Sequence, residues 1–124
     1  MKPEDIDYIN LHGTGTQAND LMEARAVYNI FGAKVPASST KPLTGHCLGA
    51  AASIETALCC RLLEKGTDKV FPHIYDGEYD EKLPKILLAD KSTKLGEVKT
   101  CLSTSFGFGG TNCAIVLRRK ICTT

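Results

Sequence analysis

The sequence lacks both an excess of charge of one sign and any long apolar run. Its 15 Lys and Arg residues nearly balance its 14 Asp and Glu residues, which leaves a formal net charge of +1. Charge alone therefore favours neither a nucleic acid nor an anionic membrane as partner. No stretch reaches the ~18 consecutive apolar residues of a membrane-spanning helix, and the amino end has no apolar targeting segment. We expect no nucleic-acid partner and no membrane partner.

The cysteines lack the spacing of a zinc site or a disulfide framework. No Cys-x-x-Cys pair occurs among the six, and Cys59 and Cys60 are adjacent. A free cysteine in an apolar stretch behaves as a small hydrophobe, and four cysteines stand in such stretches: Cys47, Cys59, Cys101 and Cys113. We therefore expect free thiols and a reducing, cytoplasmic location.

The order of predicted elements indicates a mixed α/β sheet. With 124 residues the chain is expected to form one domain. Hydrophobic periodicity and Gly and Pro positions predict strand, helix, extended piece, helix, an irregular section and a final hairpin. The expected ranges are a strand at 6–11, a helix from Asn19 or Asp20 to 31, an extended piece at 35–40, a helix at 45–65, an irregular section at 70–95, and strands at 99–105 and 113–117.

The helix expected at 45–65 has no polar face. Between Cys47 and Cys60 the only charged residue is Glu55, so the helix should be buried on all sides. One small sheet covers only one side of a helix. We infer that a second layer is missing, either another segment of a longer chain or a second subunit. The alternative is that the irregular section at 70–95 covers the helix.

The segment 12–16, His-Gly-Thr-Gly-Thr, follows the first predicted strand. A histidine at a strand end projects into the crevice where α/β folds bind ligands, and the threonines offer hydroxyl groups. The same stretch also matches a dinucleotide fingerprint through Gly13, Gly15 and Ala18. That alternative requires an acidic residue ~20 positions further on, and the range 37–40 contains none.

A second histidine, His46, follows Thr44, which is expected to cap the helix. His46 then lies in the first helical turn, where the partial positive charge favours a neutral imidazole. Such a ring donates one N–H and accepts at its other nitrogen. Glu55, alone in its uncharged stretch, should be paired, and Lys41 is the nearest plausible cation.

The third motif, at 105–112, reads Ser-Phe-Gly-Phe-Gly-Gly-Thr-Asn. Three glycines in five residues cost conformational entropy, which is tolerated where backbone N–H groups must point at a ligand. The alternative is an ordinary hairpin turn.

These three motifs, in this order and approximate spacing, resemble the carboxy-terminal half of β-ketoacyl-acyl-carrier-protein synthases of the elongating type. The similarity runs from about Ile6 to Leu117. It implies an α/β, thiolase-like fold: a mixed sheet with a buried central helix, ordered strand-helix-strand-helix and then hairpin. The domain would cover 1–120 and be incomplete, with a tail at 121–124. Polyketide ketosynthases look similar at the first motif.

The resemblance implies a decarboxylative Claisen condensation between malonyl-carrier protein and an acyl thioester, in fatty-acid or polyketide-like biosynthesis. By match to the motifs, His12 and His46 would hold the malonyl thioester oxygen as it becomes an enolate. Lys41 and Glu55 match the polar pair that supports these histidines.

Substrate-binding and metal-binding residues are implied in the same way. Thr14 and Thr16 match hydroxyls that bind the pantetheine arm. Phe108 matches a gating phenylalanine that also contributes to the oxyanion hole, and Gly109 lies in the same substrate-binding loop. Asn10, Glu55 and Ser103 match the ligands of a structural monovalent cation; no other cofactor is implied.

The nucleophilic cysteine of the family belongs to the other half of the fold, and none of the six cysteines stands in its motif. The resemblance therefore implies three partners: the missing amino-terminal half, an acyl carrier protein with malonyl and acyl thioesters, and a second copy in a homodimer. The isolated chain should be inactive. The alternatives are a non-catalytic subunit resembling chain-length factors, and the nucleotide-binding module.

Overall fold

The structure, a computed structural model, describes residues 1–120; the tail expected at 121–124 lies outside the described residues. A four-stranded mixed sheet forms its centre, with the strand order β2-β1-β3-β4. Strand β1 pairs in parallel with β2 and β3, and β3 pairs antiparallel with β4. The strands are β1 (Tyr8–Asn10), β2 (Ala37–Ser38), β3 (Thr100–Phe106) and β4 (Asn112–Arg118). The mixed sheet and final hairpin expected from the sequence are confirmed.

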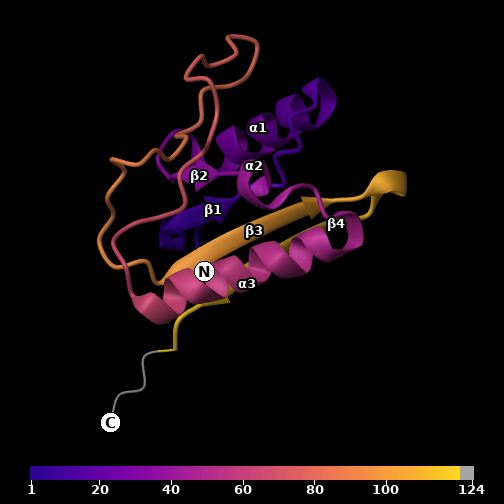
Figure 1. Cartoon of the computed structure of the whole chain (residues 1–124). Coiled ribbons are helices and arrows are strands. Elements are labelled where there is room, and N and C mark those ends of the chain that lie inside the picture. Colours follow the sequence, from indigo (N-terminus) through magenta and orange to yellow (C-terminus); the bar gives the residue numbers. More distant parts are fainter. Residues whose placement is uncertain (121–124) are drawn as a thin grey trace.

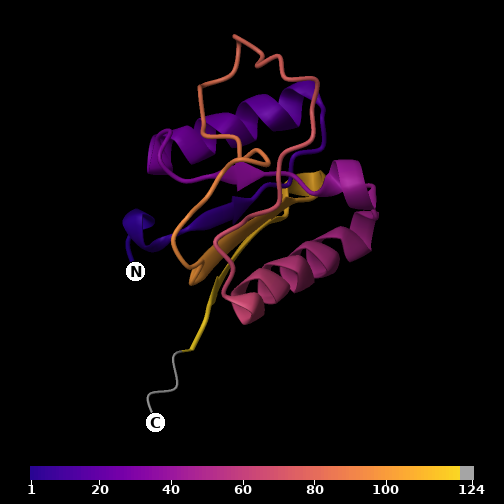
Figure 2. The same cartoon turned by 60° about the vertical axis from the view of Figure 1, so that its left-hand side comes forward.

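Two long helices lie on opposite faces of this sheet (Figures 1 and 2). They are α1 (Gln17–Phe31) and α3 (Ala51–Lys65). The irregular section, drawn in salmon and orange, runs along the side of the sheet and past α1. The short helical elements are η1 (Pro3–Asp5), α2 (Lys41–Thr44), η2 (Leu48–Ala50) and η3 (Phe108–Gly110). Of the helices described, none is long and apolar enough to cross a membrane.

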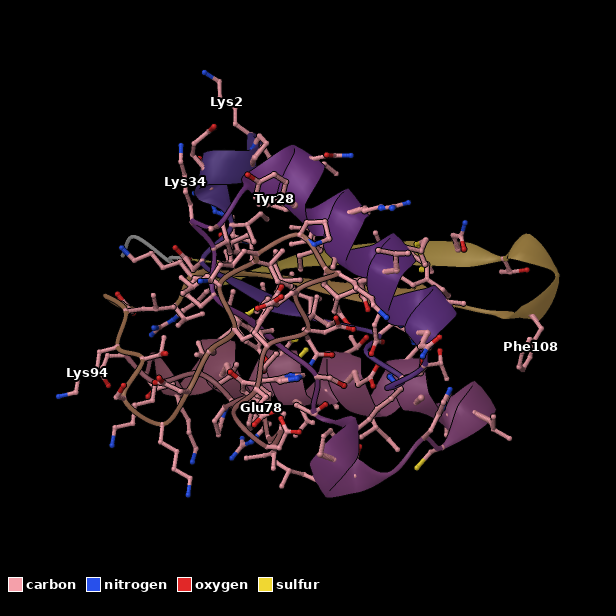
Figure 3. All side chains as sticks on the ribbon, turned by 90° about the horizontal axis from the view of Figure 1, so that it is seen from above. Lys2, Tyr28, Lys34, Glu78, Lys94 and Phe108 are labelled. Carbon is pink, nitrogen blue, oxygen red and sulfur yellow. The ribbon has the colours of Figure 1, made fainter. Side chains whose placement is uncertain are left out.

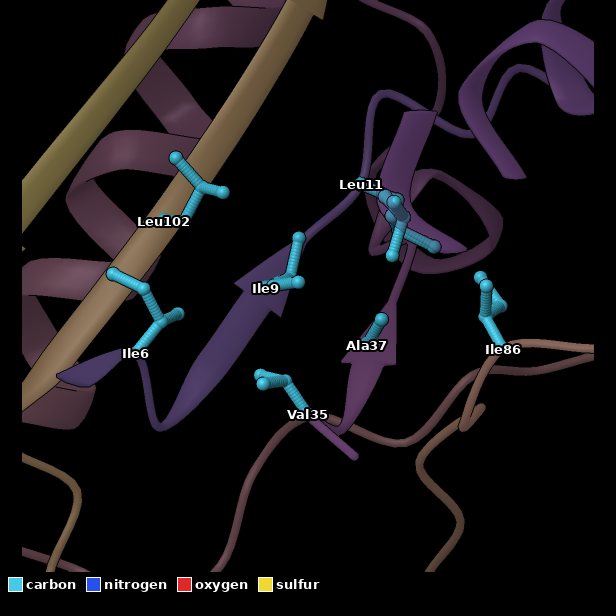
Figure 4. Close-up of a cluster of buried hydrophobic side chains, with 8 residues drawn as sticks. Ile6, Ile9, Leu11, Val35, Ala37, Ile86 and Leu102 are labelled. Carbon is cyan, nitrogen blue, oxygen red and sulfur yellow. The ribbon is translucent and has the colours of Figure 1, made fainter. Parts of the chain in front are cut away.

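Side-chain alternation along the strands produces two hydrophobic clusters. Successive strand residues point to opposite faces, so one set packs toward α1 and the other toward α3. The α1 side, drawn in Figure 4, contains Ile6, Ile9, Leu11, Val27, Val35, Ala37, Ile86 and Leu102. The α3 side contains Tyr8, Cys59, Leu62, Leu63, Val70, Ala89, Val98 and Cys101. Burying each set stabilises one sheet–helix layer.

The helix expected at 45–65 is interrupted, which corrects the sequence prediction. Thr44 does not cap it but ends the short helix α2, and α3 begins only at Ala51. Gly45 has a φ of 76°, which stops α2, and Leu48 has a φ of 49°. A left-handed residue cannot continue a right-handed helix. The first long helix also begins earlier than expected, directly after Thr16.

The helix expected at 45–65 is covered on one side only within the described residues, as the inference of a missing second layer requires. Only the sheet-facing side of α3 is buried, while Ser53, Ala57 and Arg61 on its other side are exposed. The irregular section does not cover that outer side. Just before α3, Leu48 is 71% exposed. The outer face of α3 is therefore open to a further layer.

The cysteines described here are free thiols, as expected. Cys59 and Cys101 are fully buried between α3 and β3 and act as small core residues. Cys47 and Cys113 also stand in apolar stretches of the sequence, but they are exposed and do not act as core residues. Both lie on segments with no layer packed over them in the described chain.

Candidate active site

A buried carboxylate holds the loop that follows β1. The backbone N–H groups of His12 and Gly13 each donate to Glu23 of α1, at 2.8 Å to its two oxygens. The Thr104 hydroxyl donates to the same carboxylate at 2.7 Å. Burial raises the pKa of Glu23, while the hydrogen bonds from Gly13, Thr104 and His12 lower it. Glu23 therefore fixes the backbone that carries His12.

The His12 ring is buried and faces a lysine. Its Nδ1 lies 3.4 Å from Lys41 Nζ, and an ammonium group can only donate, so Nδ1 accepts. The ring proton of neutral His12 is then on Nε2. Burial lowers the pKa of His12, and the positive charge of Lys41 lowers it further. His12 is thus held as a neutral donor.

His46 reaches the same protonation pattern by a different contact. The Leu48 N–H donates to His46 Nδ1 at 3.2 Å, which leaves the ring proton on Nε2. The helix-terminus explanation expected from the sequence is wrong, because His46 precedes α3 by several residues. The His12 and His46 ring centroids are 5.4 Å apart, with the planes at 90°. Two neutral N–H donors therefore lie side by side.

Lys41 and Glu55 form the ion pair that the sequence predicts. Lys41 Nζ contacts Glu55 Oε1, and their side chains are only 5% and 1% exposed. Lys41 thus lies between the carboxylate and His12. In a dry environment each charge depends on the other for compensation.

Two buried side-chain oxygens lack hydrogen-bond partners in the described residues: Asn10 Oδ1 and Glu55 Oε2, the second of which belongs to this pair. Asn10 and Ser103 are in register on neighbouring strands. Alternation turns both toward the α3 side, from which Glu55 projects. A hard cation prefers such oxygen ligands. The residues that the resemblance assigns to a monovalent cation therefore fit one.

Of the two predicted pantetheine ligands, Thr14 lines a cavity and Thr16 contacts Thr14. The Thr14 and Thr16 hydroxyls are 3.0 Å apart and remain partly or fully exposed. The cavity, of about 490 Å³, opens beside Thr14 between the loop after β1, α1 and the irregular section. Its lining includes Thr14, Lys41, His46, His73, Tyr75 and Tyr79.

The structure does not bring Phe108 to the histidines. Phe108 is fully exposed at the tip of the β3–β4 hairpin, where Figure 3 shows it far from the body of the chain. Gly109, at the same tip, has a φ of 78°. Phe106 instead lies edge-on to His12, with ring centroids 5.7 Å apart. The hairpin extends beyond the sheet, so its tip has nothing to pack against within the described residues.

Sequence reasoning missed Glu23, Phe106 and a third histidine, His73. Glu23 had a detectable signal, since it lies beside Ala24 on the buried face of α1, where a carboxylate requires partners. Phe106 stands in the motif at 105–112, but nothing in the linear sequence favours it over Phe108, and His73 had no signal at all.

Gly13→Ala should destabilise the fold strongly. Gly13 has a φ of +41°, and an added Cβ would lie 2.5 Å from the Ser39 Cβ. We expect a loss of about 2 kcal/mol or more in the free energy of unfolding, measured by urea titration. Gly15→Ala is the control: its φ is +76° but nothing lies within 4 Å of the added atom. Its loss should stay near ~1 kcal/mol; equal losses would contradict the packing argument.

The family model described as "Beta-ketoacyl synthase, C-terminal domain" matches residues 1–74. The chain belongs to the β-ketoacyl synthase family. It is 41% identical over 115 residues to 3-oxoacyl-[acyl-carrier-protein] synthase 1 of Haemophilus influenzae, covering 92% of this chain and 28% of that protein. Synthase 2 of Coxiella burnetii is 42% identical over 122 residues, covering 96% and 29%. This chain therefore spans less than a third of these relatives.

Solved structures of the family confirm the fold. A ketosynthase in complex with its chain length factor from Xenorhabdus doucetiae superposes with a TM-score of 0.89 at 40% identity, covering 97% of this chain and 30% of that chain. A β-ketoacyl synthase from Burkholderia phymatum gives 0.82 at 28%, covering 98% and 29%. The fold is the carboxy-terminal half of a thiolase-like ketosynthase.

Proposed function

We propose that this chain is the carboxy-terminal part of an elongating 3-oxoacyl-acyl-carrier-protein synthase, which joins malonyl-carrier protein to an acyl thioester with loss of carbon dioxide. One observation carries the proposal. His12 and His46 lie 5.4 Å apart, and each has an accepting Nδ1 and hence a proton on Nε2. Two neutral donors suit the oxygen of a thioester that becomes an enolate.

The chemistry assigned to each residue follows from its contacts. Loss of carbon dioxide leaves negative charge on the malonyl thioester oxygen, which the His12 and His46 N–H groups stabilise. One such pre-aimed donor typically lowers a barrier by about 2.7–4 kcal/mol. Lys41 keeps His12 in the donating tautomer, and Glu55 balances the lysine charge. Thr14 and Thr16 bind the pantetheine arm where Thr14 lines the cavity.

A monovalent cation completes the support of this layer. Asn10, Glu55 and Ser103 would hold it, with Glu55 contributing Oε2, the oxygen that does not contact Lys41. The two buried oxygens without partners, Asn10 Oδ1 and Glu55 Oε2, support this assignment.

The nucleophile is expected from the amino-terminal half of the enzyme. Cys47, the cysteine beside His46, is exposed. Its thiol donates to the Thr44 carbonyl oxygen at 3.5 Å, and a carbonyl oxygen is not a base that could convert the thiol to the nucleophilic thiolate. The open outer face of α3 is where this half would pack. We call the two halves together the complete synthase, which acts as a homodimer.

The test compares this chain with the complete synthase for release of carbon dioxide from malonyl-carrier protein. The complete synthase should decarboxylate and condense, whereas the isolated chain should do neither. Activity of the isolated chain would show that the nucleophile and substrate site are complete within it. An inactive complete synthase would contradict the proposed function.

A second candidate, a non-catalytic partner resembling chain length factors, is favoured by the likeness to the Xenorhabdus doucetiae complex. Such a subunit would assemble with a separate synthase and show no decarboxylation of its own. The presence of His12 and His46 in one neutral pair favours the catalytic alternative.

The dinucleotide-binding alternative conflicts with the loop geometry. A pyrophosphate would need the backbone N–H groups of the loop after β1. Two of them, from His12 and Gly13, are occupied by the Glu23 carboxylate.

A further inference from the structure

The free edge of β2 is continued by an extended piece of the irregular section. Ala37 N–H donates to the Leu87 carbonyl at 2.8 Å, and Ala89 N–H donates to the Ala37 carbonyl at 2.9 Å. In a parallel ladder the next bond would run from Ser39 N–H to the Ala89 carbonyl. That bond is absent, although Ser39 is only 1% exposed.

His73 takes both partners of the missing bond. Its backbone N–H donates to the Ala89 carbonyl at 2.7 Å, and its Nδ1 accepts from Ser39 N–H at 3.1 Å. The imidazole therefore stands where the two strands separate, and it satisfies a buried N–H that would otherwise be unpaired. Burial lowers the pKa of His73, which keeps Nδ1 available as an acceptor.

Ser39 in turn joins the two loops of the active site. Its hydroxyl donates to the Gly13 carbonyl at 2.9 Å and accepts from the Lys41 N–H at 3.3 Å. A displacement of Ser39 would therefore move the backbone on both sides of the contact between Lys41 and His12. The hydrogen bonds of Ser39 link His73 to this contact.

We propose that His73 is a positioning residue of the condensing site: its Nδ1 holds Ser39 so that Lys41 meets the His12 ring. The kinetic part of this proposal rests on the proposed function. His73 also lines the cavity shared with Lys41 and His46, so the test must separate positioning from direct contact with substrate.

Two isosteric variants of His73 in the complete synthase make that separation. His73→Asn places an amide oxygen near the position of Nδ1, so it can accept from Ser39. His73→Gln places its amide near the position of Nε2, so it can reach the cavity but not Ser39. His73→Ala removes both groups.

The expected result is a fall in kcat for malonyl decarboxylation of ~10–100-fold in the Ala and Gln variants, with KM within ~2-fold, because small misplacements of catalytic groups have effects of this size. His73→Asn should recover most of kcat. Rescue by Gln and not by Asn would overturn the proposal in favour of substrate contact. Unchanged kcat in all three variants would also overturn it.

Hydrogen exchange over 36–43 in the complete synthase gives a second measurement, independent of catalysis. Exchange should accelerate in the Ala and Gln variants and stay near wild type in Asn, because only Asn keeps the Ser39 N–H bonded. Equal exchange rates in His73→Asn and His73→Gln would overturn the proposed role of the hydrogen bond between Ser39 N–H and His73 Nδ1. If wild-type synthase releases no carbon dioxide, the proposed function fails while this measurement still decides the role of His73.

Discussion

His46→Ala in the complete synthase is expected to lower kcat for malonyl decarboxylation by about 10²–10³-fold, the usual effect of removing one pre-aimed donor. His12→Ala should have a comparable effect. The physical reason is that each ring supplies one Nε2–H where negative charge develops. The measurement is carbon dioxide release from malonyl-carrier protein, which isolates this step from acyl transfer.

Matched substitutions at 46 test the proton assignment. His46→Gln keeps an N–H near the position of Nε2 and should retain more activity than His46→Asn, whose amide lies near Nδ1. Cys47→Ala is the control, since Cys47 is exposed and adjacent but has no role in the proposed chemistry. Wild-type decarboxylation by either histidine-to-alanine variant would contradict the role of that histidine as a donor. Loss of activity in Cys47→Ala would contradict the assignment of the nucleophile to the amino-terminal half.

Lys41→Met is expected to lower the free energy of unfolding by about 3–5 kcal/mol, because it leaves a buried carboxylate without its counter-charge. Glu55 is only 1% exposed, so water cannot replace the lost partner. The double variant Lys41→Met with Glu55→Leu should recover most of this loss, since replacing a whole buried pair by apolar groups is often neutral. Urea titration measures the free energy of unfolding of the single and the double variant.

The double variant also separates stability from catalysis. Its stability should recover, but decarboxylation should not, because the Nδ1 of His12 still lacks the ammonium donor. The control is the exposed pair Arg61–Glu64, with side chains 66% and 61% exposed. Arg61→Met should change stability by less than ~1 kcal/mol. Similar losses in Lys41→Met and Arg61→Met would contradict the importance of burial.

The contacts around His12 form one connected arrangement. Glu23 of α1 fixes the backbone of the histidine, and Lys41 after β2 fixes its ring. Ser39 and His73 then connect the loop after β1 to the irregular section. Three segments far apart in the sequence thus determine the orientation of one imidazole, which explains why single substitutions in any of them are expected to affect the chemistry.

The amino-acid sequence by itself determined the order of elements and the pairing of the site residues. Alternation and turn residues predicted the mixed sheet and the β3–β4 hairpin, because period-2 patterns and glycines act locally. The need to compensate a buried Glu55 pointed to Lys41 as its partner, whereas the placing of His12 and His46 in one site was implied by the resemblance of their motifs to the family. These features depend on short-range chemistry or on a charge that must be compensated wherever it is buried.

Only the tertiary structure decided how that site is held. A left-handed Leu48 after Gly45 divides the expected helix, so a backbone N–H rather than a helix terminus sets the tautomer of His46. Phe106 rather than Phe108 packs edge-on against His12. His73 accepts the hydrogen bond from Ser39 N–H where the backbone ladder ends. Each of these contacts joins residues separated by a turn or by tens of positions. They depend on where whole segments pack, and no local pattern in the sequence carries that information.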